Sequence, residues 1–291
     1  MKKTCKYILA LASSLLPIMC FGASAWLPPP GRLDLSLGFG QETFRQFWQG
    51  TQRVTLANII VKNQYYGGFV YGLTDRFAID LLTGAGNSKW AAGTRGNLGG
   101  RLDTDVGLLY RAIDETTSRY WWMPTTTFRA GGTIKGTYAL ANANAPANLQ
   151  GLGNKVNGTQ LSILLGKFLP HNVGLFGEFG WRYRGSPVPN ALFGNVGVLQ
   201  TIFDHWTWSI FYNTYRAVSG LDIGKAPFTG VIGPFGLQAT KEQTGFMNGS
   251  LTYGFNGGQA ITLVYAYAVS GRNSGVQSIP SLFVTLPIQT R

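Results

Sequence analysis

The chain has 291 residues, of which only 12% are charged, while 45% are hydrophobic and 13% aromatic. Soluble domains usually carry about 25% charged residues, so this composition argues against a surface that faces water on all sides. The formal net charge of +12 would suit an anionic partner. Nucleic acid is not expected as that partner, because the sequence has no Lys/Arg-rich run and phosphate binding needs clustered positive charge.

The first 25 residues have the organisation of a secretory signal peptide. Three lysines precede an apolar centre, and Ala23–Ala25 supplies the small residues of a cleavage site. We therefore expect residues 1–25 to be a cleavable signal and residues 26–291 to form one exported domain. An uncleaved membrane anchor is the alternative, but the apolar stretch is short and Pro17 interrupts it. Both cysteines lie in the signal, so we expect no disulfide in the exported chain.

Runs of alternating apolar and polar residues follow the signal. In "RLDLSLGFG", residues 32–40, Leu33, Leu35 and Leu37 share one face, and this period of two is typical of β-strands. The same pattern predicts twelve strands, near residues 32–40, 62–71, 76–85, 101–112, 119–131, 158–168, 173–184, 192–203, 207–218, 244–255, 259–269 and 278–288.

The connections between these strands alternate in length. Tight Gly, Asn or Asp turns fall at one end, and longer stretches, such as 86–100, 134–158 and 219–241, fall at the other. Membrane helices need about 18 consecutive apolar residues, and the exported domain has no such run. A closed barrel is the other structure that pairs every backbone group inside lipid.

We therefore predict an all-β fold, a transmembrane antiparallel up-and-down β-barrel of about 12 strands, with short periplasmic turns and longer external loops. Its location would be the bacterial outer membrane, with lipid and lipopolysaccharide as neighbours. A secreted β-sandwich is the alternative, and it should lack the inside/outside difference in loop length. In a barrel, Phe77, Ile79 and Leu81 would face lipid, and Arg76 and Asp80 would face the interior or its rim.

Aromatic residues favour the barrel over the sandwich. Trp and Tyr prefer the two bilayer interfaces, where the ring is apolar and its polar tip stays hydrated. They cluster near predicted strand ends at Tyr65, Tyr66, Tyr120, Trp121, Trp122, Trp181, Tyr183, Trp206 and Trp208.

Four segments resemble a family of Gram-negative outer-membrane barrels. They are "YGLTDRFAIDL" (71–81), "DTDVGLLYRAI" (103–113), "FGWRYRGSP" (179–187) and "VSGRNSGVQSIPSLFV" (269–284). The family comprises transporters associated with degradation of phenol and other aromatic compounds, and related barrels of unassigned role. The resemblance implies a barrel in the outer membrane that passes solutes.

One departure is the last strand, which contains Pro287 and does not finish on the aromatic residue usual in such barrels. Because proline cannot donate to the ladder, we expect Pro287 where the strand ends or is unpaired.

The sequence gives little sign of catalysis. Barrel lipases and proteases need a histidine beside a nucleophile or carboxylate, and His171 and His205 both fall in predicted periplasmic turns. Hydrolase, metal-ligand and phosphate-loop motifs are not apparent. We expect no enzyme activity, no catalytic or metal-binding residue and no cofactor.

Charged residues within the strands should face the lumen, because Arg or Lys facing lipid costs about 2–4 kcal/mol at mid-bilayer. They would line a polar path that selects solutes, or pair with one another and fill the barrel. The lumen-lining candidates are Asp34, Asp80, Asp103, Asp105, Arg111, Arg129, Glu178, Arg182 and Arg184. In loop 219–241, the apolar residues Phe228, Val231, Ile232 and Phe235 are candidates for a gate or a binding pocket at the barrel mouth.

The leading function is passive uptake of small solutes, hydrophobic or aromatic ones included. The alternative is a closed structural or adhesive barrel whose external loops bind lipopolysaccharide, matrix polymer or another surface. An open lumen would favour the first function, and a sealed lumen the second.

Overall fold

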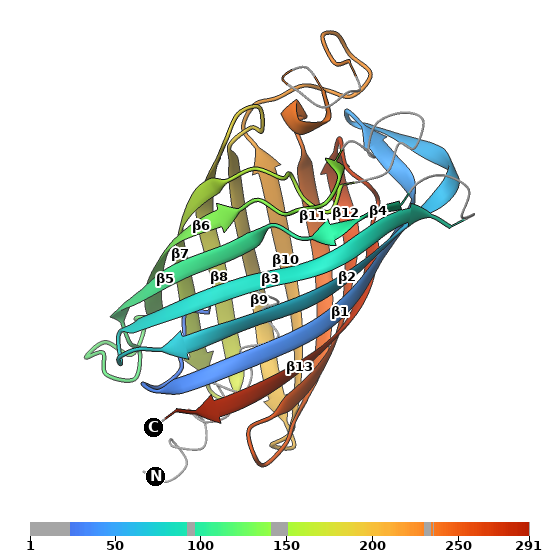
Figure 1. Ribbon diagram of the computed structural model, residues 1–291. Helices are drawn as coiled ribbons and strands as arrows, with labels where there is room; N and C mark the ends of the chain where they lie inside the picture. Colours follow the sequence, from blue (N-terminus) through green and yellow to red (C-terminus); the bar gives the residue numbers. More distant parts are fainter. Residues whose placement is uncertain (1–23, 92–96, 141–150, 230–233, 235, 291) are drawn as a thin grey trace.

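The computed structural model describes residues 24–91, 97–140, 151–229, 234 and 236–290. Within this part of the chain, thirteen strands form one antiparallel sheet that closes where β1 pairs with β13 (Figure 1). The strands are β1 (Arg32–Gln49), β2 (Gln52–Gly72), β3 (Phe77–Trp90), β4 (Asn97–Arg101), β5 (Thr104–Ile113), β6 (Thr125–Ile134), β7 (Gly158–Leu169), β8 (Val173–Arg184), β9 (Ala191–Ile202), β10 (Trp206–Ala217), β11 (Gln243–Gly254), β12 (Ala260–Arg272) and β13 (Ser278–Gln289).

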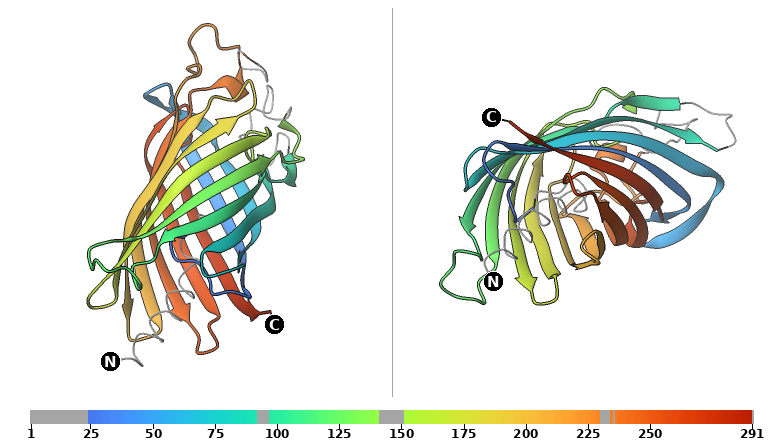
Figure 2. Two further views of the ribbon diagram at one scale, coloured as in Figure 1. Left: turned by 90° about the vertical axis from the view of Figure 1, so that its left-hand side faces the viewer. Right: turned by 90° about the horizontal axis from the view of Figure 1, so that it is seen from below.

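The ring has twelve positions, because β4 and β5 share one. Both strands pair with β3, β4 near its end and β5 near its beginning, and they are separated only by Leu102 and Asp103. The predicted antiparallel barrel of about 12 strands is therefore confirmed. In the view from below in Figure 2 (right), the sheet is a closed ring around the lumen.

Side chains alternate across this wall in the opposite sense to a soluble protein. Along β12, Ala266 and Ala268 are buried toward the lumen, while Tyr265 and Tyr267 are exposed on the outer face. Small residues fit the crowded interior, and large apolar residues cover the outside. The alternation read from the sequence thus gives the two faces of the wall, and the apolar face points outward.

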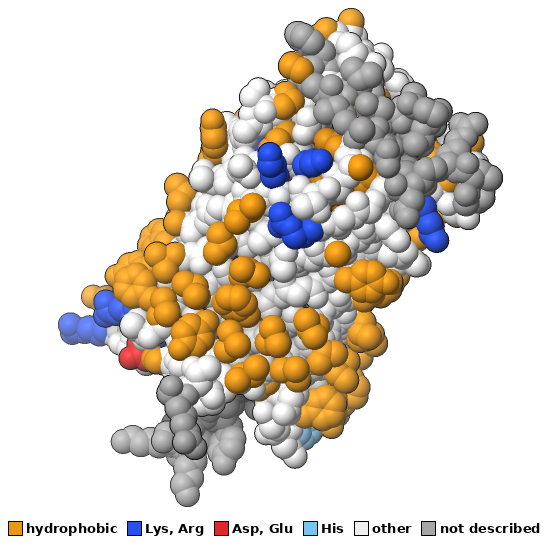
Figure 3. Space-filling view, viewed as in Figure 1, with side chains coloured by type: hydrophobic (Ala, Val, Ile, Leu, Met, Phe, Trp, Pro, Cys, Tyr) orange, Lys and Arg blue, Asp and Glu red, His pale blue; other side chains and the backbone are white. Residues whose placement is uncertain are grey.

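The exposed apolar side chains form a continuous band around the part of the wall seen in Figure 3. Water would disfavour this surface, whereas the hydrocarbon core of a bilayer matches it. The prediction that Phe77 faces outward is confirmed, since its side chain is exposed. Other exposed members include Leu108, Ile134, Leu161, Phe179, Val196 and Leu263.

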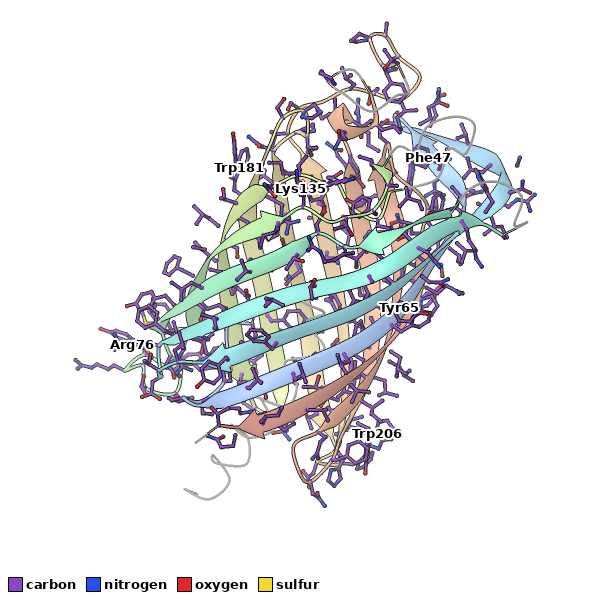
Figure 4. The ribbon with its side chains drawn as sticks, viewed as in Figure 1. Phe47, Tyr65, Arg76, Lys135, Trp181 and Trp206 are labelled. Carbon is purple, nitrogen blue, oxygen red and sulfur yellow. The ribbon has the colours of Figure 1, made fainter. Side chains whose placement is uncertain are left out.

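The two longest connections, before β7 and before β11, lie at one end of the barrel, although the two-residue turn between β1 and β2 lies there too. At the other end, three or four residues join β2 to β3, β7 to β8 and β9 to β10, and His171 and His205 lie in two of these tight turns. Trp206 and Arg76 lie toward this end, and Phe47 and Lys135 toward the other (Figure 4). A 3-10 helix, η3 (Leu237–Ala239), lies in the long connection before β11. No helix in the described ranges is long and apolar enough to cross a membrane.

Strand boundaries differ from the prediction in three regions of the chain. β1 and β2 run on past residues 40 and 62 to meet at a tight turn, where Gly50 has a φ of +57°. Residues 86–100 are mostly strand, because β3 continues to Trp90 and β4 returns beside it. Residues 119–124, predicted as strand, form a turn instead, since Pro124 has no N–H to donate to a ladder and the Met123 N–H donates to the Tyr120 carbonyl within the turn.

Pro287 lies where the sequence predicted. It is opposite Asp34 of β1, but the pairing of β13 with β12 ends at Thr285. The missing N–H therefore falls near the end of the last strand, beyond the partner strand on one side, and the ladder tolerates it.

Candidate functional site

A cavity of about 740 Å³ lies inside the outer end of the barrel, the end with the long connections. Strands β1, β2 and β11 form part of its wall, and segments of the loops before β7 and before β11 also contribute. A volume of this size suits a small organic molecule. The apolar lining residues are Phe44, Phe47, Leu56, Ile60, Trp90, Leu140, Leu152, Ile223, Phe228, Leu237, Phe246 and Ile279.

An ion pair lies in the wall of this cavity. Lys62 Nζ lies 2.5 Å from Glu42 Oε2, and Gln277 Nε2 donates to Glu42 Oε1 at 2.6 Å. Glu42 and Lys62 occupy directly opposed positions of β1 and β2. Both side chains are buried, so the pair and the amide satisfy charges that would otherwise be costly inside the barrel.

A second polar group lines the same cavity. The guanidinium of Arg184 lies over the ring of Tyr215, 4.9 Å from its centroid. Glu242, just before β11, also lines the cavity, and burial raises the pKa of its carboxyl despite the opposing charges of Arg184 and Lys62. The cavity thus combines a largely apolar wall with a few polar groups, the usual composition of a small-molecule site.

The connection between β10 and β11 supplies part of the cavity's cover. Phe228 lines the cavity, as the sequence led us to expect of this loop. Val231, Ile232 and Phe235, the other gate candidates, lie outside the described residues.

Asn273 fastens this connection to the barrel rim. Its Oδ1 accepts hydrogen bonds from the backbone N–H groups of Gly50 and Ile223, at 2.8 and 3.0 Å. Its Nδ2 donates to Leu221 O and Lys241 O. A single buried side chain therefore joins the tip of the β1–β2 hairpin to both ends of the loop.

An adjoining ion pair strengthens the same junction. Arg272 Nη2 lies 2.5 Å from Asp222 Oδ2, and its Nε donates to Oδ1 at 2.8 Å. These hydrogen bonds lower the pKa of the Asp222 carboxyl below its ordinary value. The carboxylate is therefore ionised at neutral pH and able to hold the loop.

Deeper in the lumen, Asp80 and Arg129 form a two-pronged ion pair. Arg129 Nε and Nη2 donate to the two Asp80 oxygens at 2.6 and 2.8 Å. Gly107 lies on β5, the strand between those that carry Asp80 and Arg129. A Cβ added to Gly107 would lie 2.4 Å from Asp80 Oδ1. Glycine at this position leaves the space that the ion pair fills.

More polar contacts surround that pair. Arg182 donates to Gln160 Oε1 and lies 3.7 Å from Asp105 Oδ2. Glu178 accepts from Ser162 Oγ at 2.7 Å. Ser162 lies directly opposite Arg129 in the sheet, so Glu178 joins the Asp80–Arg129 and Asp105–Arg182 pairs in one polar layer of the lumen, which gathers five of the lumen candidates.

The segment before β1 occupies the end of the lumen opposite the cavity. Ala25 and Leu27 are buried among Ala78, Leu109 and Leu164. Trp26 Nε1 donates to Glu115 Oε1 at 3.0 Å, and its ring lies 4.5 Å from that of Phe168. A Cβ on Gly166 would lie 2.6 Å from the Trp26 ring, so the segment fits closely against the wall.

The remaining sequence candidates lie apart from the polar layer. Asp34 faces inward and pairs with Arg32, whose Nε lies 2.7 Å away. Arg111 lies at the turn end, where its Nη1 is 3.3 Å from Asp114 Oδ2. Arg184 lines the outer cavity.

Asp103 has a different environment from the other candidates. Its carboxylate accepts from the backbone N–H groups of Gly136, Asn154 and Lys155, at 2.7–3.2 Å. Tyr138 also donates its hydroxyl to Asp103, and burial raises the pKa of that phenol above its ordinary value. Asp103 therefore organises the base of the loop between β6 and β7.

Sequence reasoning missed Glu42 and Lys62. Carrying the alternation of β1 past residue 40 would have placed Glu42 on the same face as Asp34, so the signal was present. In the described part of the chain, no group of three or more His, Cys, Asp or Glu side chains is arranged to hold a metal ion.

Comparisons with known proteins bear on the fold. No protein-family model matches the sequence, and no curated protein matches it significantly. An outer membrane channel from Pseudomonas putida F1 superposes with a TM-score of 0.67 over 92% of this chain and 98% of its own, at 15% identity. The translocator domain of the autotransporter NalP from Neisseria meningitidis superposes with a TM-score of 0.48 over 99% of this chain and 97% of its own, at 13% identity. A FadL homologue from Pseudomonas aeruginosa superposes with a TM-score of 0.47 over 92% of each chain, at 11% identity.

The first of these likenesses shows that the chain shares its fold with an outer-membrane channel, as the resemblance in the sequence implied. The other two are too distant to carry an argument. The fold and the apolar outer face together define a transmembrane β-barrel.

Proposed function

We propose that this protein is a passive channel of the bacterial outer membrane for small hydrophobic solutes, aromatic ones included, and not an enzyme. The observation that carries the proposal is the cavity of about 740 Å³ at the outer end, lined mainly by apolar side chains. An apolar solute would leave water for this cavity and then move down its gradient. The few polar groups there would orient a solute that carries a hydroxyl or a carboxylate.

Ile60 offers a direct test of solute binding. It is buried and lines the cavity, so Ile60→Asn would place a polar amide against the apolar wall. Binding of naphthalene to the refolded chain (residues 26–291) should weaken about tenfold or more, corresponding to the loss of a buried apolar contact. Titration calorimetry in detergent micelles would measure it. Val218→Asn is the matched control, because Val218 is exposed and outside the cavity lining.

Single-channel recording in planar bilayers tests transport itself. Discrete conductance steps that naphthalene modulates in the wild type, but not in Ile60→Asn, would support the channel. Equal binding by the wild type and by Ile60→Asn, with no effect of the solute on conductance, would contradict it.

A second function has a specific observation in its favour. Below the cavity, the lumen holds the ion-paired polar layer and the segment Trp26–Leu27, which together would close the barrel to solutes. The protein would then be a structural barrel whose external loops bind lipopolysaccharide, matrix polymer or another surface. A demonstrably folded barrel that never conducts and binds no apolar solute would favour this function.

A further inference from the structure

A group of basic residues lies on the outer end of the barrel between β4 and the beginning of β7. Arg101 ends β4, Lys135 follows the last residue of β6, and Lys155 precedes β7. Arg101 Nη2 donates to Lys135 O at 2.8 Å, so the first two residues are in contact. Lys135 is exposed on the upper part of the wall (Figure 4).

Asp103 brings Lys155 to the same place. The Asp103 carboxylate accepts from the backbone N–H of Gly136, next to Lys135, and from that of Lys155. The backbone at residues 135–136 and at 155 therefore converges on one side chain. We refer to Arg101, Lys135 and Lys155 as the basic patch.

The positive charge of this patch is not neutralised by an ion pair. Among the described residues, none of its three members forms an ion pair with a carboxylate. Asp103 is the nearby acid, and it is occupied by three backbone N–H groups and the Tyr138 hydroxyl. The segments 92–96 and 141–150, which adjoin β4 and this loop in the sequence, contain no Asp or Glu.

The patch begins where the lipid-facing surface ends. Ile134, immediately before Lys135, is 52% exposed, and Val106 and Leu108 are exposed on β5 below Arg101. Arg101 Nη1 also donates to Thr104 Oγ1, a hydroxyl at the start of the same strand. Figure 3 shows Lys and Arg side chains on the wall beyond the apolar band, on the side of the long connections.

We propose that the basic patch binds the phosphate groups of lipid A, the phosphorylated glycolipid of the outer leaflet. This inference rests on the outer-membrane location within the proposed function, but not on transport. The acyl chains would lie along Ile134, Val106 and Leu108, and the phosphates would meet the guanidinium and ammonium groups just above them. Ionised hydrogen bonds to phosphate are strong, and Arg presents its donors in a fork that fits phosphate oxygens.

Native mass spectrometry of the refolded chain (residues 26–291) in detergent tests the proposal, with diphosphorylated lipid A as the probe. Each basic residue contributes about fivefold to binding an anionic lipid surface, so Arg101→Gln/Lys135→Gln/Lys155→Gln should weaken lipid A binding about a hundredfold. The variant Lys135→Gln/Lys155→Gln keeps the hydrogen bonds of Arg101 and should weaken binding about 25-fold. This second variant decides the question if the triple variant fails to fold.

The matched control removes three exposed positive charges elsewhere: Arg76→Gln/Arg119→Gln/Lys225→Gln. It should bind lipid A as the wild type does. Dephosphorylated lipid A should bind the wild type as weakly as diphosphorylated lipid A binds the triple variant.

Equal affinity of the basic-patch and control variants for lipid A would overturn the proposal. So would competition by inorganic phosphate at an equal concentration, because the site would then recognise the free ion. Conductance plays no part in these outcomes, so failure here leaves the channel untouched.

Discussion

The outer and inner parts of the lumen differ in what fills them. The outer part holds a cavity of about 740 Å³ with a mainly apolar lining. The part below it is filled by the Asp80–Arg129 pair, its polar neighbours and the segment Trp26–Leu27. Apolar space favours binding of a greasy solute, whereas matched charges favour a rigid, filled interior. Under the proposed function, the barrel therefore separates a place for binding from a place that controls passage.

The largest expected effect comes from breaking the central ion pair. Asp80→Asn leaves the buried Arg129 guanidinium without its counter-charge, which should lower the free energy of unfolding by about 3–5 kcal/mol. Urea unfolding in lipid vesicles would measure the change. Asp80→Asn/Arg129→Gln, which removes both charges, should recover most of the loss. If Asp80→Asn alone were neutral, the polar layer would not be the rigid part of the lumen.

The inner segment should be the main obstacle to ions. Gly166→Leu would place a side chain where the Trp26 ring lies and should displace the segment from the wall. We expect a severalfold rise in single-channel conductance, with Phe228→Ala as a control that alters only the outer cavity. Unchanged conductance in a folded Gly166→Leu barrel would show that the polar layer alone limits passage.

Asp103 and Asp105 look alike in the sequence, but their substitutions should affect the ion selectivity of the channel differently. Asp105→Asn removes a charge beside Arg182 in the polar layer, so cation selectivity, measured as a reversal potential in a salt gradient, should fall. Asp103→Asn should leave selectivity nearly unchanged, because its carboxylate holds loop backbone. Equal shifts for both variants would contradict the different positions assigned to them.

The smallest expected effect is that of acid on the connection between β10 and β11, which should become more mobile at low pH. The pKa of Asp222 is lowered in the folded protein, so its contribution is complete above the ordinary carboxyl pKa and is lost as the pH falls through the lowered value. A spin label at Ser219→Cys should keep its mobility from pH 8 to 5 and gain mobility only below about pH 4. Gain of mobility near neutral pH would rule out this carboxylate as the group responsible.

The alternation in the sequence was sufficient for the wall but not for what lies inside it. It placed Asp80 and Arg129 on the inner face, because a strand has a period of two. Their pairing depends on the registers of β3 against β5 and of β5 against β6, and on the space above Gly107, which a single strand does not reveal. For Asp103, the alternation of inward and outward side chains does not hold. The strand is interrupted at Leu102–Asp103, so this side chain lies outside the regular ladder.

The cavity and the inner segment were harder to predict for another reason. Phe228 was suspected because an apolar residue in a long loop is unusual, but the other walls of the cavity come from distant parts of the chain. The segment Trp26–Leu27 has no periodic pattern. Its position follows from close contacts with residues far along the sequence, such as Trp26 against Gly166.

The pairing of β1 with β13 has a consequence for how the molecule is made. The first and last strands of the ring meet, so closure waits until β13 has reached the membrane. Until then both edges of the sheet present unpaired backbone groups, which promote aggregation. Contacts between such distant residues also form slowly. Deletion of β13 would therefore leave an open sheet with two exposed edges.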